Sequence, residues 1–243
     1  MHKLRLKFSK KGPIKFIGHL DVMRYFQKAI RRADIDIKYS EGFSPHQLLS
    51  FAQPLSVGAT SDGEYLDMVV NSFTSEKDIM DRLNSVCNEG ITIRAVRELD
   101  EKEEKAMTLS FAAKYEVRMR QSSQLPAGWT DDFMRFLSRD KLPAMKKTKS
   151  GEKEIDMKPM IFDCRPLTDG DGVELILSMN SKETLKVSLL FQYFFESCGL
   201  DFSPVYLNIN RADIYRLFTD PDGRRYIEPF IPANDDERFY LDG

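Results

Sequence analysis

The chain has 243 residues, of which 42% are hydrophobic and 30% are charged, values that are ordinary for a folded globular protein. It contains no run of about 18 apolar residues, and its first residues alternate charged and apolar side chains, so the sequence predicts neither a transmembrane helix nor a secretion signal. The cysteines Cys87, Cys164 and Cys198 form no CxxC or CxxxCxxC pattern. This argues against a zinc site or an iron–sulfur cluster and fits a reducing compartment. We therefore expect a cytoplasmic protein without metal, cofactor or membrane partner.

The formal net charge of −2 conceals an uneven distribution of charge. Residues 1–53 contain 11 Lys or Arg and 4 Asp or Glu, a net charge of +7, so the remaining residues carry −9. A basic opening in a nearly neutral chain indicates a local anionic partner rather than a polyanion that coats the whole protein. The alternative interpretation is a solvated basic face, because Lys and Arg lie mostly at protein surfaces.

Apolar periodicity predicts the order strand, helix, strand, strand, helix, strand for the first half of the chain. The helix at residues 19–33 has apolar residues at spacings of three and four. A second helix at 75–88 begins with Ser75 as N-cap and Asp78 as a near match to a capping box, and Gly90 is its expected end. The predicted strands are residues 3–9, 35–40, 64–71 and 91–98, with a further candidate at 47–53.

The same order of elements returns after the acidic segment DEKEEK at residues 100–105, which we interpret as part of a charged linker. The second set consists of a strand at 114–120, a helix at 130–139, a hairpin formed by 142–150 and 152–161, a strand at 173–179, a helix at 185–198 and a strand at 205–217.

Two such sets predict an α+β protein of two tandem ferredoxin-like (βαββαβ) halves. We place the first half at residues 1–100, the charged linker at 101–112 and the second half at 113–218. Residues 219–243, rich in acids with Pro and Gly, form the expected C-terminal arm, either a loop or an ordered extension.

The predicted helix at residues 19–33 also carries a basic face. Arg24, Lys28 and Arg31 follow at spacings of four and three residues and therefore line one side of the helix. Such a row of cations can contact the phosphates of a nucleic acid. Candidates to extend this surface from the second half are Lys146, Lys147 and Lys149.

The segment YSEGFSPH at residues 39–46 has the composition of a stiff loop. Gly42 permits a positive φ, Pro45 fixes its own φ, and the residue before the proline is restricted to extended geometry. Ser and His side chains can bind phosphates or base edges, and aromatic rings can stack on unpaired bases, each worth about 1–3 kcal/mol. The alternative interpretation is a corner between two strands with Phe43 in the core. The binding candidates of this loop are Tyr39, Ser40, Gly42, Phe43, Pro45 and His46.

Two histidines are candidates for general acid–base chemistry. His19 stands at the start of the predicted helix, just before Asp21, whose carboxylate suits the helix dipole. His46 follows a proline in a polar loop. The alternative interpretations are a capping or buried role for His19 and a purely helix-starting role for Asp21, so the catalytic assignment stays open. No P-loop, GxGxxG or HExxH motif is present, which excludes the commonest nucleotide and zinc-hydrolase sites.

A long ordered motif runs through residues 3–67: a strand, HLD with the basic helix, YSEGFSPH, and SFAQPLSVGATSDGEYLD. It closely resembles the radical-SAM-linked bacterial proteins, a domain of unknown function whose pattern includes YSxGFxPxP and SFAxPLxxGxxSxxEYLD. The segment KKTKSGEKEIDMKPMI at 146–161 is similar to the hairpin of that family, and LNINRADIYRL at 207–217 is a weaker match. One departure is His46-Gln47, where the pattern usually has a second proline near residue 47, which predicts a less rigid loop here.

The resemblance implies that the partner of this chain is a radical S-adenosylmethionine (SAM) protein. It also implies a genomic neighbourhood of ribosomal proteins and an RNase of the E/G type. It implies no activity of the chain itself. Because the cluster-binding cysteines are missing, we do not expect the chain to perform radical SAM chemistry.

Three functions fit these observations. The favoured one, which is not enzymatic, is an accessory binding module that presents an RNA (tRNA or rRNA) or an RNA-linked substrate to a separate radical SAM enzyme. The second is a metal-independent RNA-processing or RNA-modifying enzyme that uses a histidine. Its layout would be similar to CRISPR repeat-processing endoribonucleases, although their glycine-rich C-terminal loop is missing. The third is a protein–protein adaptor without nucleic acid, docked through acidic stretches and sheet edges.

Overall fold

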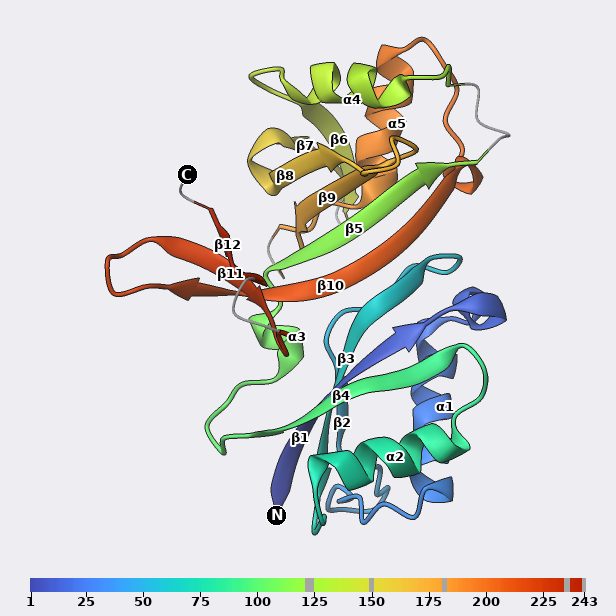
Figure 1. Cartoon of the computed structure of the whole chain (residues 1–243), viewed down its shortest axis with the longest axis vertical. Helices are drawn as coiled ribbons and strands as arrows, with labels where there is room; N and C mark the ends of the chain where they lie inside the picture. The colour runs from blue at the N-terminus through green and yellow to red at the C-terminus, as the bar shows by residue number, and fades with distance from the viewer. Residues whose placement is uncertain (121–124, 149–150, 181–182, 234–236, 242–243) are drawn as a thin grey trace. The chain divides into compact units, whose positions relative to one another are not determined.

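A computed structural model shows an α+β protein with five α-helices in the described part of the chain. None of these helices is long and apolar enough to cross a membrane. The chain divides into two compact units (Figure 1). Unit 1 consists of Met1–Ser110 and Arg211–Gly243, and unit 2 of Phe111–Asn210. The described residues are 1–120, 125–148, 151–180, 183–233 and 237–241.

Unit 1 is built on an antiparallel sheet. Its strands follow the order β4-β1-β3, and the second edge of β3 is shared by the short strand β2 and by β10. Strand β11 pairs with β10 and with β12, both antiparallel. The elements are β1 (His2–Lys10), η1 (Gly12–Phe16), α1 (His19–Arg32), β2 (Leu49–Phe51), β3 (Thr60–Val70), α2 (Glu76–Val86), β4 (Ile91–Leu99), α3 (Ala106–Leu109), β10 (Leu207–Thr219, of which Leu207–Asn210 belongs to unit 2), β11 (Arg225–Pro229) and β12 (Phe239–Tyr240).

The alternating side chains of β1 divide unit 1 into an apolar and a polar side. Leu4, Leu6 and Phe8 are buried in one cluster with residues of α1 and α2, and the rings of Phe8 and Phe26 lie 4.7 Å apart. Arg5 alternates with these residues and is also fully buried, with its guanidinium 4.7 Å from the ring centre of Phe230. The polar side of the sheet is therefore covered by the C-terminal segment of the chain.

Helices α1 and α2 form where the apolar periodicity predicts them. On α1, Val22, Phe26, Ala29 and Ile30 are buried, and the other positions between Val22 and Ile30 are exposed or half-buried. The N-cap of α2 is confirmed, because Oγ of Ser75 accepts a hydrogen bond from the backbone N–H of Asp78 at 3.1 Å. The predicted end of α2 at Gly90 is wrong, because the helix ends at Val86 and Gly90 lies in the turn before β4.

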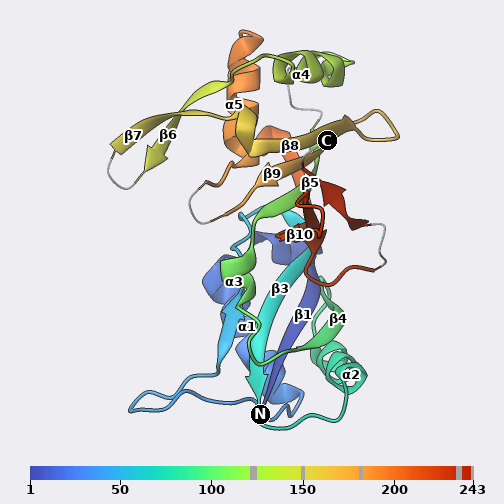
Figure 2. The same cartoon turned by 90° about the vertical axis from the view of Figure 1, so that its left-hand side faces the viewer.

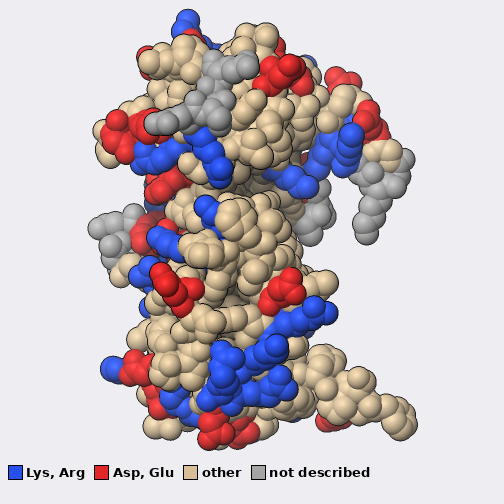
Figure 3. Space-filling model, turned by 90° about the vertical axis from the view of Figure 1, so that its right-hand side faces the viewer, with Lys and Arg blue, Asp and Glu red and all other residues tan. Residues whose placement is uncertain are grey.

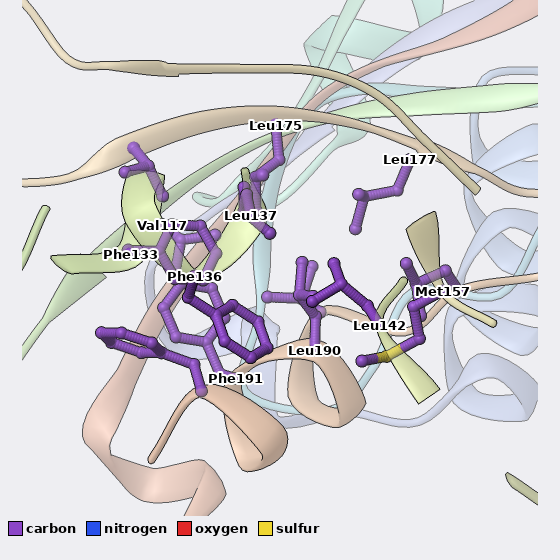
Figure 4. Packing of buried hydrophobic residues seen from close by; sticks show 14 of the residues in the cluster. Val117, Phe133, Phe136, Leu137, Leu142, Met157, Leu175, Leu177, Leu190 and Phe191 are labelled. Carbon is purple, nitrogen blue, oxygen red and sulfur yellow. The ribbon is translucent and has the colours of Figure 1, made fainter. Parts of the chain in front are cut away.

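Unit 2 contains a second antiparallel arrangement. Strand β9 lies between β5 and β8, and the order is β10-β5-β9-β8. Its core gathers aromatic residues of α4 and α5, and the stacked rings of Phe133 and Phe191 lie 4.7 Å apart (Figure 4). The elements are β5 (Ala112–Met119), α4 (Trp129–Leu137), β6 (Pro143–Thr148), β7 (Gly151–Asp156), η2 (Lys158–Met160), β8 (Ile161–Pro166), β9 (Val173–Ser178), α5 (Val187–Ser197) and η3 (Pro204–Tyr206).

Two strand predictions need correction. Residues 35–40 form no regular strand, since Ile37 makes only an isolated bridge to Val70 and Tyr39 another to Gln47. The predicted hairpin exists as β6 and β7, but these strands form a separate two-stranded sheet. The place beside β9 is taken by β8, which was not predicted because IFDCRP is mostly half-buried and lacks a clear alternation.

The C-terminal arm is an ordered part of unit 1 rather than a loop. It contains β11 and β12, and its Ile227 and Phe230 are 0% and 1% exposed. The acid-rich composition of the arm gave no sign of this burial. Two buried apolar side chains are nevertheless enough to hold the segment against the sheet.

Candidate nucleic-acid interface

The segment Tyr39–Gln47 forms a narrow loop that is closed by its own hydrogen bonds. The backbone N–H of Ser40 donates to the carbonyl of His46 at 2.8 Å, and the backbone N–H of His46 donates to Oγ of Ser40 at 3.1 Å. The same Oγ lies 2.8 Å from Nδ1 of His46. Gly42 sits at the tip with φ of 107°, a conformation that favours glycine. The loop is therefore stapled at its base by Ser40 and His46.

The tip of this loop exposes an aromatic ring. Phe43 is fully exposed, with a relative accessibility of 112%, which contradicts the alternative that it belongs to the core. Tyr39, at the base, is 43% exposed. The loop that follows α1 extends away from the rest of unit 1 in Figure 2. Because the ring of Phe43 is exposed to water, a partner that covers it would bury apolar surface. Phe43 is therefore available to stack on a ring of a bound partner.

The base of the loop is fastened to α1. Gln47 is 5% exposed, and its Nε2 donates to the carbonyl of Gln27 at 3.3 Å and to the hydroxyl of Tyr39 at 3.4 Å. Tyr39 and Arg31 line one open hollow of about 500 Å³, together with residues 34–37. The structure thus brings the loop and the last cation of the basic face to one surface.

The predicted basic face of α1 is exposed. Arg24, Lys28 and Arg31 all belong to the exposed class. Arg24 makes an ion pair of 3.4 Å with Asp21, but both side chains are more than half exposed, so the pair contributes little and can open. Asp21 lies in the first turn of α1, as expected. Lys and Arg side chains gather on the lower half of the face seen in Figure 3, the side on which α1 lies.

The two candidate histidines lie in different surroundings. His19 is the first residue of α1, half-buried, with its ring edge-on to Phe51 at 5.4 Å between ring centres. It lines a cavity of about 20 Å³, large enough for one water molecule, together with Lys10 and Glu64. Burial lowers the pKa of the Lys10 ammonium, and the carboxylate of Glu64 opposes that shift. His46 is instead exposed at the base of the loop.

The lysines of the second half are placed in unit 2. Nζ of Lys146 donates to the carbonyl of Thr184 at 2.8 Å, which occupies one of its three protons. Lys147 is exposed on β6, and Lys149 lies outside the described residues.

A buried polar network was missed by the sequence analysis. Arg5, which is 0% exposed, donates from Nε and Nη2 to the carboxylate of Asp67 at 2.7 and 3.0 Å and from Nη1 to Glu103 at 2.9 Å. Arg211, 2% exposed, donates from Nε to Glu64 at 2.7 Å and from Nη2 to the carbonyl of Gln53 at 2.8 Å. These contacts are charge-assisted and fix the strands in register.

The same network explains the motif SDGEYLD. The hydroxyl of Tyr65 donates to Asp213 at 2.6 Å, and Nζ of Lys7 donates to the other oxygen of that carboxylate at 2.5 Å. Gly63 is required by packing, because a Cβ there would lie 2.6 Å from the carbonyl oxygen of Ala212. The motif therefore packs against, and forms hydrogen bonds with, the segment NRADIY of β10. The available signal was the alternation of charged residues in strand-like segments.

The DEKEEK segment is more than a charged linker. Its Glu103 is mostly buried, with a side chain that is 13% exposed, and accepts from Arg5 and, at 3.2 Å, from Arg216. Burial lowers the pKa of the Arg216 guanidinium, an effect that Glu103 opposes. A charge run in sequence gives no sign of which member finds a buried partner, since that depends on strands distant along the chain.

Among the residues that the structure describes, no group of three or more His, Cys, Asp or Glu side chains could hold a metal ion. The candidate site consists of the exposed cationic face of α1 and the stapled loop that carries Tyr39 and Phe43. Residues 3–187 match the family described as "Uncharacterized protein conserved in bacteria (DUF2344)", and the chain belongs to this family. No curated protein matches its sequence.

Proposed function

We propose that this bacterial protein binds RNA through unit 1 and presents it, or a substrate attached to it, to a separate radical SAM enzyme. The observation that supports RNA binding is the hollow shared by Arg31 of the basic face and Tyr39 of the loop. It joins one phosphate-binding cation to one ring that can stack on a base, the two components of single-strand recognition, and its other polar lining residues are Asp34 and Asp36.

The fold interpretation supports the same proposal by analogy. Numbered in chain order with β6 and β7 left out, the strand orders β4-β1-β3-β2 and β10-β5-β9-β8 both read 4-1-3-2, the order of a ferredoxin-like sheet, although most of β10 belongs to unit 1. The β6–β7 hairpin is then an insertion between the first helix and the second strand of unit 2. We interpret the chain as two ferredoxin-like units on this basis. Sheets of this kind often carry RNA, which raises the expectation but does not assign the function.

The radical SAM partner rests on the resemblance of the motif at residues 3–67. The chain itself has only three cysteines, without the spacing that holds an iron–sulfur cluster, so the chemistry belongs to the partner in this proposal. The scattered cysteines are consistent with the bacterial cytoplasm as the common compartment.

The test is fluorescence-anisotropy titration of labelled tRNA and rRNA fragments over a range of salt concentrations. For single strands the slope of log K against log salt is about −0.7 per phosphate contact, so loss of three contacts reduces the slope by about 2. We expect this reduction for Arg24→Glu/Lys28→Glu/Arg31→Glu.

A matched control separates local contacts from net charge. Lys77→Glu/Arg94→Glu/Lys102→Glu makes the same change of charge at three exposed positions of unit 1 outside α1. RNA affinity should fall much less in this variant. Equal losses in the two triple variants would contradict a defined interface on α1. No binding by the wild type at any salt would refute RNA binding and favour the protein–protein adaptor.

The second candidate is an RNA-processing enzyme, which one observation favours. His19 lines the same small cavity as Lys10 and Glu64, so a histidine, an ammonium and a carboxylate meet at one place. A histidine there could act as general base, with the cation stabilising developing charge. Time-dependent cleavage or modification of the bound RNA, abolished by His19→Ala but retained in His46→Ala, would support it. Intact RNA after prolonged incubation would contradict the enzyme hypothesis and favour the binding module.

A further inference from the structure

Unit 1 contains a further concave site, a cleft of about 270 Å³ at the β2 edge of β3. One part of its lining is apolar, with Leu48, Leu49 and Leu99. The other part is polar and includes His46, Ser50 and Lys105. A concave apolar surface with a few convergent polar groups is the usual composition of a small-ligand site.

The acidic wall of the cleft is rigid and neutralised. Asp67 and Glu103 both line it, and both are held by the fully buried Arg5. Asp67 also accepts from the backbone N–H of Ala106 at 2.7 Å. Because Arg5 and Arg216 balance the two carboxylates, the cleft keeps the positive charge of its lysines, Lys3 and Lys105. The wall is thus preorganised, and the net charge favours an anionic ligand.

The stapled loop connects this cleft with the basic face of α1. Neighbouring residues of an extended segment point to opposite sides. Gln47 accordingly contacts α1, whereas His46 lines the cleft. Nδ1 of His46 is engaged by Ser40, so Nε2 is the ring nitrogen left for a ligand among the described residues. A chain bound along Arg31 and Tyr39 therefore passes the base of the loop, where His46 lines the cleft.

We propose that the cleft holds one nucleobase of the bound RNA. This inference rests on the proposed function, because the base belongs to the RNA that unit 1 binds. A base has apolar faces for the leucines, hydrogen-bonding edges for His46 and Ser50, and an attached phosphate for Lys3 or Lys105. Sites for drug-sized ligands span roughly 300–1,000 Å³, so 270 Å³ suits a single flat group of this size.

The test uses the four nucleoside 5′-monophosphates as probes. Isothermal titration calorimetry measures their binding to the full chain. Two cleft variants are compared with the wild type. Ser50→Trp fills the cleft, and Lys3→Ala/Lys105→Ala removes its cations without adding bulk. A control, Ser56→Trp, adds the same ring at an exposed position outside the lining.

We expect saturable binding of at least one monophosphate by the wild type and by Ser56→Trp, and affinity about tenfold weaker or worse in both cleft variants. The salt slope of RNA binding should fall by about 0.7 at most in Ser50→Trp, because only the phosphate beside Lys3 or Lys105 is displaced and the α1 cations are intact. No monophosphate binding, or equal binding by wild type and both cleft variants, overturns the assignment of the cleft even if RNA still binds α1. If the wild type binds a monophosphate but binds no RNA, the proposed function is overturned instead.

Discussion

Breaking the buried ion pair between Arg211 and Glu64 on one side only is expected to cause one of the largest single losses of stability in unit 1. The two side chains are 2% and 8% exposed, and Arg211 also donates to the carbonyl of Gln53. Arg211→Met leaves a carboxylate and a carbonyl without their donor in a site that little water reaches. Removing one partner of a buried pair costs about 3–5 kcal/mol, so we expect a loss of this size in the free energy of unfolding.

The double variant provides a sharper test of this pair. Arg211→Met/Glu64→Met replaces both charges with flexible apolar chains that fill irregular space. The desolvation cost of both charges then disappears together with their attraction, so the double variant should lie within about 2 kcal/mol of the wild type. The exposed pair of Lys77 and Asp81 on α2 supplies the control, and Lys77→Met should cost less than about 1 kcal/mol.

Urea unfolding followed by far-UV circular dichroism measures these differences. The single tryptophan, Trp129, lies in unit 2, so its fluorescence reports that unit separately and should change less than the dichroism of the Arg211 variant. A loss below about 1 kcal/mol in Arg211→Met, or a double variant whose loss equals the sum of the single losses, would refute the argument that the pair is stabilised as a unit.

Three further predictions follow from local geometry. Ser75→Ala removes the N-cap of α2 and should lower the free energy of unfolding by about 1 kcal/mol, measured in urea, whereas Ser75→Asp should restore it. Phe133→Ala should cost about 3–5 kcal/mol, measured by the unfolding midpoint of the unit 2 tryptophan signal, because the ring is fully buried and stacked on Phe191; a loss under about 1 kcal/mol would contradict this packing. Burial raises the pKa of the Cys164 thiol to about 12, so at pH 8 a disulfide reagent should modify the exposed Cys198 first, and rapid native modification of Cys164 would refute its burial.

Short-range patterns determined much of this protein. The apolar spacing of α1, the capping serine of α2 and the alternation in β1 depend on neighbours within a few residues, and all three elements form as predicted. The same holds for the positive φ of Gly42 in its loop. These features follow from local sterics and hydrogen bonding, which do not need knowledge of the rest of the chain.

Only the tertiary structure decided which charged residues are buried and which strands are neighbours. Arg5 and Glu103 are far apart in the sequence, as are Arg211 and Glu64. In the sequence alone each of these residues resembles an ordinary surface residue, because its partner is brought close only by folding. The unpredicted β8 and the cleft beside His46 have the same cause, since both are made by segments that meet only in the folded chain. A buried charge is stable only beside its counter-charge, and that pairing is a property of the fold rather than of any window of sequence.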